Sequence, residues 1–194
     1  MASLLRLDGR IGFGALPIRL GPSIRVPDVT INHPAGARPA VTGVMGMDFD
    51  NLTAVMRHLA LEAGEKIMEI YKSEDLGVKA KADESPVTLA DEAADALISA
   101  GLREAFPDTP LVTEEQADSH DQSAMTFLIV DPLDGTKEFV QRRGDFTVNI
   151  AYVADGVPVR GVVYAPAKER LFYTTATGQS VEETGPFDSR TLGD

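Results

Sequence analysis

The sequence predicts an α+β fold in which two helices pack on an antiparallel sheet. Apolar residues recur at helical spacing twice before residue 107, whereas beyond residue 126 they form short runs and two-residue alternations that are typical of strands. Helices followed by a block of strands favour an α+β arrangement over alternating strand–helix units. With 194 residues, of which 43% are hydrophobic, the chain can build one domain of ordinary size, or one domain and a fragment of a second.

The first 46 residues differ from the rest in charge and composition. They carry five Arg against two Asp, whereas residues 47–194 carry 13 basic against 28 acidic side chains. They also hold seven of the 17 Gly and five of the 12 Pro, without helical or strand periodicity. We expect residues 1–46 to be a disordered leader or the product of a start placed too far upstream, with Met45 and Met47 as alternative starts. A transit peptide is disfavoured, because the Pro residues break the amphipathic helix that such peptides need.

Two helices are expected between residues 48 and 107. The first follows an N-cap at Asp48 or Asp50 and ends near Tyr71, with its apolar side chains at helical spacing. The second begins after Thr88 and stops at Pro107, because proline cannot continue a helix.

The remaining expected elements are short strands. Asp155-Gly156 is a hairpin turn signal, since both residue types tolerate the positive φ of such turns. Beyond Gly178 no regular element is expected, because that stretch is polar and rich in turn-forming residues. The expected strands are Leu111–Thr113, Phe127–Val130, an alternating run from Phe146 to Tyr152, Val157–Tyr164 and Leu171–Thr175.

Composition excludes several classes of function. A net charge of -12 argues against a nucleic-acid polymer or an anionic lipid surface as a partner. The absence of cysteine excludes thiolate metal sites and a cysteine nucleophile, and the three histidines share no spacing that suits a metal site. No apolar run approaches the roughly 18 residues that span a bilayer, and without a convincing signal the cytoplasm is the expected compartment. An acidic enzyme acting on a phosphate would need metal cations to hold its substrate.

The densest candidate for chemistry is the run Asp131-Pro132-Leu133-Asp134-Gly135-Thr136, directly after an expected strand. Pro132 makes the chain leave the strand sharply, and Gly135 permits a tight turn. Such a turn can aim both carboxylates and the Leu133 carbonyl at one point, which offers the hard oxygen ligands that Mg²⁺ prefers. A helix that starts after Gly135 would present its N–H groups to an anion beside the metal. The alternative is a surface turn that forms for conformational reasons alone.

Two further acidic positions have a structural and a chemical interpretation each. Glu114-Glu115 follows Leu111–Thr113, where a strand could end at the same edge of the sheet, but adjacent glutamates are also typical of a solvated surface. Asp91 stands three residues after Thr88, so it is either a capping-box acid at the start of a helix or a chemical group. These residues alone leave both choices open.

Taken together, the motifs resemble the inositol monophosphatase-like superfamily of metal-dependent phosphatases. They are, in order, Ser85-Pro86-Val87-Thr88 with Ala90-Asp91, then Glu114-Glu115, then the run from Asp131 to Phe139. The Thr-Lys-Glu-Phe after the Asp-Gly pair, with Gly144–Ala151 and Gly161–Pro166, is similar to the 3'(2'),5'-bisphosphate nucleotidase branch called CysQ, whereas inositol phosphatases usually carry Thr-Asn-Phe there. The resemblance runs from about Asp48 to about Gly178 and implies the N-terminal half of a layered α/β sandwich.

The resemblance implies a site and a substrate. Mg²⁺ would be held by Glu114, Asp131, the Leu133 carbonyl and Asp134, with Glu115 beside them. The substrate would be 3'-phosphoadenosine 5'-phosphate, a small phosphorylated nucleotide that is cleaved to AMP and phosphate.

Roles around the substrate follow from the same resemblance. Thr136, hydrogen-bonded to Asp91, would orient or deprotonate the attacking water. The amides of Gly135 and Thr136 would contact the phosphate, and Glu114 would line the substrate site.

One departure from the family pattern bears on activity. Family members continue into a second α/β domain with a Trp-Asp motif whose Asp is a further metal ligand, and this sequence has no Trp. We therefore expect residues 47–194 to be an incomplete metal-binding domain, with the second domain missing. Two alternatives to nucleotide hydrolysis stay open: an inositol or sugar phosphate phosphatase with the same chemistry, and an inactive truncated remnant. A homodimer could supply the missing part.

Overall fold

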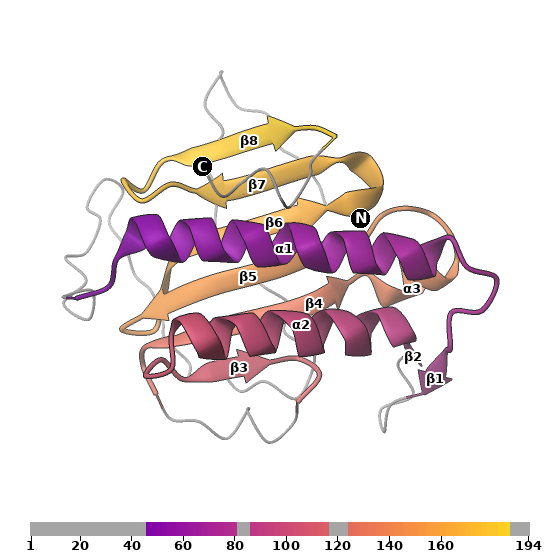
Figure 1. The fold of residues 1–194 in the computed structure, drawn as a ribbon, viewed down its shortest axis with the longest axis horizontal. Coiled ribbons are helices and arrows are strands. Elements are labelled where there is room, and N and C mark those ends of the chain that lie inside the picture. Colours follow the sequence, from indigo (N-terminus) through magenta and orange to yellow (C-terminus); the bar gives the residue numbers. More distant parts are fainter. Residues whose placement is uncertain (1–45, 81–85, 117–123, 187–194) are drawn as a thin grey trace.

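The computed structural model describes residues 46–80, 86–116 and 124–186 (Figure 1). Residues 1–45, which hold the predicted leader, lie outside these ranges. Two long helices precede most of the strands, which confirms the α+β class. In chain order the elements are α1 (Phe49–Tyr71), β1 (Lys79–Ala80), β2 (Pro86–Val87), α2 (Leu89–Ala105), β3 (Leu111–Thr113), β4 (Phe127–Asp134), α3 (Thr136–Val140), β5 (Thr147–Ala154), β6 (Val157–Ala165), the 3-10 helix η3 (Pro166–Lys168), β7 (Arg170–Thr174) and β8 (Ser180–Thr184).

The two long helices lie side by side on one face of the sheet (Figure 1). α1 begins where predicted, because the Asp48 carboxylate accepts hydrogen bonds from the amides of Asp50 at 3.0 Å and Asn51 at 3.1 Å. α1 approaches the sheet closely at Gly64, where a Cβ would lie 2.3 Å from the ring of Tyr164 on β6. A side chain at this position would push α1 away from the sheet. No helix in the described ranges is both long and apolar enough to cross a membrane.

Six strands form one sheet in the order β3-β4-β5-β6-β7-β8. Neighbouring strands are antiparallel except β3 and β4, which run parallel. The sheet is therefore mixed, where the sequence predicts an antiparallel one. The physical reason is the long connection between Thr113 and Phe127, since a parallel pair needs enough chain to return to the start of the next strand.

The core lies between the two helices and the sheet. Inward side chains alternate along β5 as strand periodicity predicts, with Val148, Ile150 and Tyr152 buried. Most buried polar side chains of the described ranges lie on α2, at its N-cap or on β3. They are Thr88, Asp91, Asp95, Ser99 and Thr113.

β8 is a strand in the region beyond Gly178, where the sequence analysis expects no element. It pairs antiparallel with β7. Glu182 of β8 binds Arg170 of β7 at 2.6 Å, and Glu183 binds Arg57 of α1 at 2.6 Å. The charged residues that suggest a loop thus have basic partners on other elements, which a local pattern does not reveal.

The turn between β5 and β6 confirms the predicted hairpin. Asp155 has a φ of 52° and Gly156 a φ of 74°, as the tight turns that suit strand twist require. The other predicted strands are present with ends that shift by a few residues.

Candidate metal centre

The carboxyl ends of β3 and β4 lie next to each other, as the sequence analysis predicts. Thr113 pairs with Val130 in parallel register, and the Glu114 amide donates to the Val130 carbonyl at 3.0 Å. Glu114 and Asp131 therefore leave neighbouring strands at the same level. Both side chains are half-buried, so they are not the fully solvated surface residues of the alternative interpretation.

β4 continues past its predicted end and contains an irregularity. Between Asp131 and Asp134 the register against β5 shifts, because three steps along β4 oppose two steps along β5. The extra residue makes a bulge. It places Pro132 and Leu133 together in the buried layer, while Asp131 is half-buried and Asp134 exposed. In a regular strand Asp131 and Leu133 would share one face.

Gly135 makes the sharp turn from β4 into α3. Its φ is +93°, and a Cβ would lie 2.7 Å from the carbonyl oxygen of Asp145 and 3.2 Å from Cα of Phe146. Backbone atoms close this space, so glycine is required for both conformation and volume. α3 starts at the next residue, Thr136, as predicted for a helix after Gly135.

A three-ring cluster of Tyr71, Phe139 and Phe146 anchors α3. The ring centroids are 5.0, 5.1 and 5.2 Å apart, and the Phe139 and Phe146 side chains are buried. Aromatic pairs at such distances stabilise packing beyond the area that they bury. The turn that carries Asp134 and Thr136 is therefore held by core packing from Tyr71 of α1 and from Phe146, the residue before β5.

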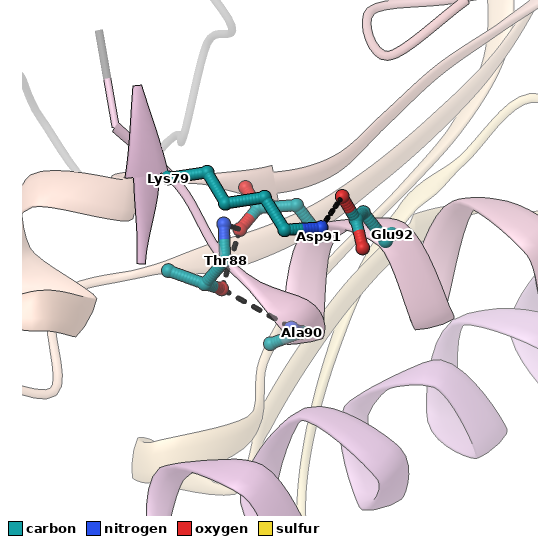
Figure 2. Close-up of polar contacts among 5 residues, drawn as sticks. All are labelled: Lys79, Thr88, Ala90, Asp91 and Glu92. Carbon is teal, nitrogen blue, oxygen red and sulfur yellow. Dashed lines mark hydrogen bonds and ion pairs between the residues drawn. The ribbon is translucent and has the colours of Figure 1, made fainter. Parts of the chain in front are cut away.

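Asp91 makes the contacts that both of its interpretations require. Its Oδ2 accepts hydrogen bonds from the amide of Thr88 at 2.7 Å and from the Thr88 hydroxyl at 2.6 Å, which closes a capping box at the start of α2 (Figure 2). Its Oδ1 accepts a hydrogen bond from Thr136 Oγ1 at 3.1 Å, the contact that the resemblance implies. The same hydroxyl lies 3.2 Å from the Leu133 carbonyl oxygen. Burial raises the pKa of Asp91, and these hydrogen bonds oppose the increase.

An exposed ion pair stands beside the cap. Lys79 Nζ of β1 lies 2.7 Å from Glu92 Oε1 of α2 (Figure 2). Exposed pairs of this kind contribute little to stability, so the contact joins β1 to the start of α2 without fixing it.

The carboxylates at this edge repel one another. The pKa of Asp131 is raised from 3.8 to about 8, first by burial and then by the negative charges of Asp134 and Glu114. Asp91 adds a smaller contribution in the same direction. Acidic side chains from α2, from the end of β3 and from β4 therefore act on one another at one place.

These groups match the chemistry of a Mg²⁺ site. Carboxylate and carbonyl oxygens are the ligands that Mg²⁺ prefers, and the repulsion of Asp131 by Asp134 and Glu114 favours a cation beside them. In the part of the chain that the structure describes, no group of three Asp, Glu or His side chains is already arranged as a cage around a metal ion. The carboxylates lie at the same edge of the sheet and are close enough to repel one another, but they do not converge on one point, as expected for like charges.

The residues that carry this edge match a known family. The family model described as "Inositol monophosphatase family" matches residues 48–189. The chain belongs to the inositol monophosphatase family. This family member is 46% identical over 128 residues to the 3'(2'),5'-bisphosphate nucleotidase CysQ of Escherichia coli (strain K12). The aligned residues make up 64% of this chain and 52% of that protein.

Solved structures share the fold of this inositol monophosphatase family member. CysQ from Bacteroides thetaiotaomicron has a TM-score of 0.59 at 40% identity, over 71% of this chain and 50% of that one. An IMPase of Thermotoga maritima has a TM-score of 0.61 at 28% identity, over 70% of this chain and 52% of that one. The chain thus spans about half the length of the relatives that it matches. Two helices on a six-stranded sheet are the part of the fold that it shares with them.

The structure of this family member brings the predicted site residues to one edge and adds two that sequence reasoning misses. Asn149 Nδ2 of β5 lies 3.5 Å from Asp134 Oδ2, and the run Gly144–Ala151, which carries part of the family resemblance, is the signal that could have identified it. Asp95 is buried one turn beyond Asp91, and the four-residue spacing on a helix is a signal that could have identified it. The predicted residues at this edge are Asp91, Glu114, Asp131, Leu133, Asp134, Gly135 and Thr136.

Proposed function

We propose that this chain provides the Mg²⁺ site of a phosphatase that hydrolyses 3'-phosphoadenosine 5'-phosphate to AMP and phosphate. The observation that carries the proposal is the set of acidic side chains at the ends of β3 and β4, where burial first and then the charges of Asp134 and Glu114 raise the pKa of Asp131 to about 8. Membership of the inositol monophosphatase family supports the phosphatase chemistry. The 46% identity to the 3'(2'),5'-bisphosphate nucleotidase CysQ of Escherichia coli supports a bisphosphorylated nucleotide as the substrate class.

The proposed ligands of Mg²⁺ are the carboxylates of Glu114, Asp131 and Asp134 and the carbonyl oxygen of Leu133. When bound, Mg²⁺ supplies positive charge that makes a water more acidic and neutralises the phosphate. Because the pKa of Asp131 is about 8 without a cation, this side chain holds a proton at neutral pH and must release it on binding. Mg²⁺ affinity is therefore expected to increase with pH.

Thr136 and Asp91 are the proposed proton-handling pair. Thr136 donates its hydroxyl proton to Asp91 Oδ1, so the Thr136 oxygen can accept a hydrogen bond from the attacking water. When that water loses a proton to Thr136 Oγ1, the Thr136 proton passes to Asp91 Oδ1. Burial raises the pKa of Asp91, which makes its carboxylate a stronger base than an exposed one.

Gly135 and Thr136 are the proposed contacts to the phosphate. Gly135 carries no side chain, so an anion can approach the backbone amides at the turn into α3. Glu114, at the end of the neighbouring strand, is the residue proposed to line the substrate site beside them. An in-line displacement at phosphorus requires the phosphate to be held in a fixed orientation, which these contacts would supply.

Inositol phosphate is the second candidate substrate, because a structure named as an IMPase shares the fold as well as a CysQ structure does. The IMPase of Thermotoga maritima shares the fold at a TM-score of 0.61, against 0.59 for the Bacteroides thetaiotaomicron CysQ. The acidic groups described above act on the phosphate and not on the rest of the substrate, so both substrates suit the same chemistry.

The test is Mg²⁺-dependent phosphate release by the full chain from 3'-phosphoadenosine 5'-phosphate, with inositol 1-phosphate as the competing substrate. Asp134→Asn should abolish release, because it removes a proposed ligand at an exposed position where folding is tolerant. Asp108→Asn, which removes an exposed carboxylate outside the site, should leave release unchanged. Release that survives Asp134→Asn or the removal of Mg²⁺ contradicts the proposal. A folded parent chain that releases no phosphate would instead support the inactive alternative.

A further inference from the structure

Asp95 is the centre of a buried polar network beside the proposed site. It lies on α2 one turn beyond Asp91, and only 6% of it is exposed. Its Oδ1 accepts a hydrogen bond from the hydroxyl of Thr113, and its Oδ2 accepts one from Gln116 Nε2 at 2.6 Å. A carboxylate away from water needs several donors. Here two of them come from the residues that flank Glu114-Glu115.

The network holds the Glu114-Glu115 turn from both sides. Thr113 Oγ1 donates to Asp95 and accepts a hydrogen bond from the amide of Glu115 at 3.2 Å. On the other side, the amide of Gln116 donates to the Thr113 carbonyl at 3.3 Å, which closes the turn. The segment with both glutamates is therefore attached to α2 at its start and at its end.

The geometry points to Asp95 as a positioning residue, which holds Glu114 through Thr113 and Gln116 in the place where it binds Mg²⁺. This inference rests on the proposed function, since it gives Glu114 its role as a ligand. Residues that hold a metal ligand from behind typically change metal affinity 10- to 100-fold when they are replaced.

One face of α2 binds the residues at the ends of both β3 and β4. Asp91 and Asp95 are four residues apart, so they project from the same side of α2. Asp91 binds Thr136 at the end of β4, whereas Asp95 binds Thr113 at the end of β3. α2 thereby sets the position of one side of the site relative to the other.

The first test compares Thr113→Val with Thr113→Ser in the full chain. Valine keeps the shape and removes the hydroxyl, whereas serine keeps the hydroxyl. Calorimetric titration with Mg²⁺ should show about tenfold weaker binding for Thr113→Val and near-parent binding for Thr113→Ser. Hydrogen exchange of the Glu114 amide, which does not bond to the Thr113 side chain, should be faster in Thr113→Val alone. Thr53→Val is the matched control. It also removes the hydroxyl of a buried threonine, but Thr53 lies on α1 and binds Thr174, so this variant should change neither the Mg²⁺ affinity nor the exchange of the Glu114 amide.

A second set of variants addresses Asp95 itself. Asp95→Asn should weaken Mg²⁺ binding, and the double variant with Thr113→Val should lose less affinity than the two single losses combined, because both substitutions change the Asp95–Thr113 hydrogen bond. If Thr113→Val fails to fold, Gln116→Met at a half-buried position breaks the other attachment and should speed exchange of the Glu114 amide.

The outcomes separate this inference from the proposed function. Parent-like Mg²⁺ affinity or unchanged Glu114 exchange in the folded variants overturns the positioning role and leaves the phosphatase proposal standing. Faster exchange together with a parent chain that binds no Mg²⁺ overturns the proposed metal site, and with it the role of Asp95 in metal binding.

Discussion

Replacing Asp131 by Asn should stabilise the metal-free protein, and the gain should grow with pH. The folded chain holds the Asp131 proton up to about pH 8, whereas the unfolded chain loses it near 3.8. Between these values the folded state binds more protons, so the free energy of unfolding falls as pH rises. Asp131→Asn has no carboxyl group to ionise at this position, so its free energy of unfolding does not fall with pH for this reason.

The magnitude follows from the shift in pKa. One pKa unit corresponds to about 1.4 kcal/mol, so a shift from 3.8 to about 8 sets a ceiling of about 6 kcal/mol. Because Asp131 is half-buried and water screens part of the repulsion, we expect a stabilisation of about 2 to 3 kcal/mol at pH 8 relative to pH 5.

The assay is urea denaturation with a chelator present, from about pH 4 to about pH 9, for the parent, Asp131→Asn and Asp108→Asn. The difference between the parent and Asp131→Asn should widen steadily with pH and level off above pH 8. Asp108→Asn, which replaces an exposed Asp, should follow the parent at every pH. Parallel curves for the parent and Asp131→Asn would refute the reasoning that burial and the neighbouring charges raise the pKa of Asp131.

Three further predictions concern the turn after β4 and its support. Gly135→Ala should destabilise the fold by about 2 kcal/mol or more, since it combines a positive φ with a Cβ 2.7 Å from the Asp145 carbonyl oxygen; urea denaturation measures this. Phe139→Ala should cost about 3 to 5 kcal/mol by removing the buried ring at the centre of the three-ring cluster, and an unchanged melting temperature would contradict that packing role. Thr136→Val should lower the phosphate-release rate by about 100-fold or more at unchanged thermal stability, because it removes the hydroxyl that binds Asp91, and Thr136→Ser should restore the rate.

Local signals explain why the helices could be predicted from the sequence. Asp48 and Thr88 cap their helices with side chains that reach amides two or three residues away, and Pro107 ends the second pattern. Such contacts are visible in a short window of sequence. The sequence predicts that the strand from Phe127 ends at Val130, whereas β4 runs to Asp134, because the bulge before Asp134 depends on pairing with β5.

The features that could not be predicted from the sequence depend on partners that lie far away in the chain. β8 has two glutamates in a polar run, and their basic partners Arg170 and Arg57 lie on other elements. Asp95 reads as one more charge on an amphipathic helix until Thr113 is known to face it. For the candidate site, residue types and spacing predict the shared edge of β3 and β4, and only tertiary structure shows that Asp91 binds Thr88 with one oxygen and Thr136 with the other.

The placement of α1 has a consequence for how the protein folds during synthesis. Thr53 and Arg57 of α1 bind Thr174 and Glu183, which follow 121 and 126 residues later in the chain. At translation rates of roughly 5 to 20 residues per second, the helix waits on the order of ten seconds for these partners. During that interval the apolar face of α1 is not yet covered by the strands of the sheet. We therefore expect the nascent chain to need chaperone protection at α1.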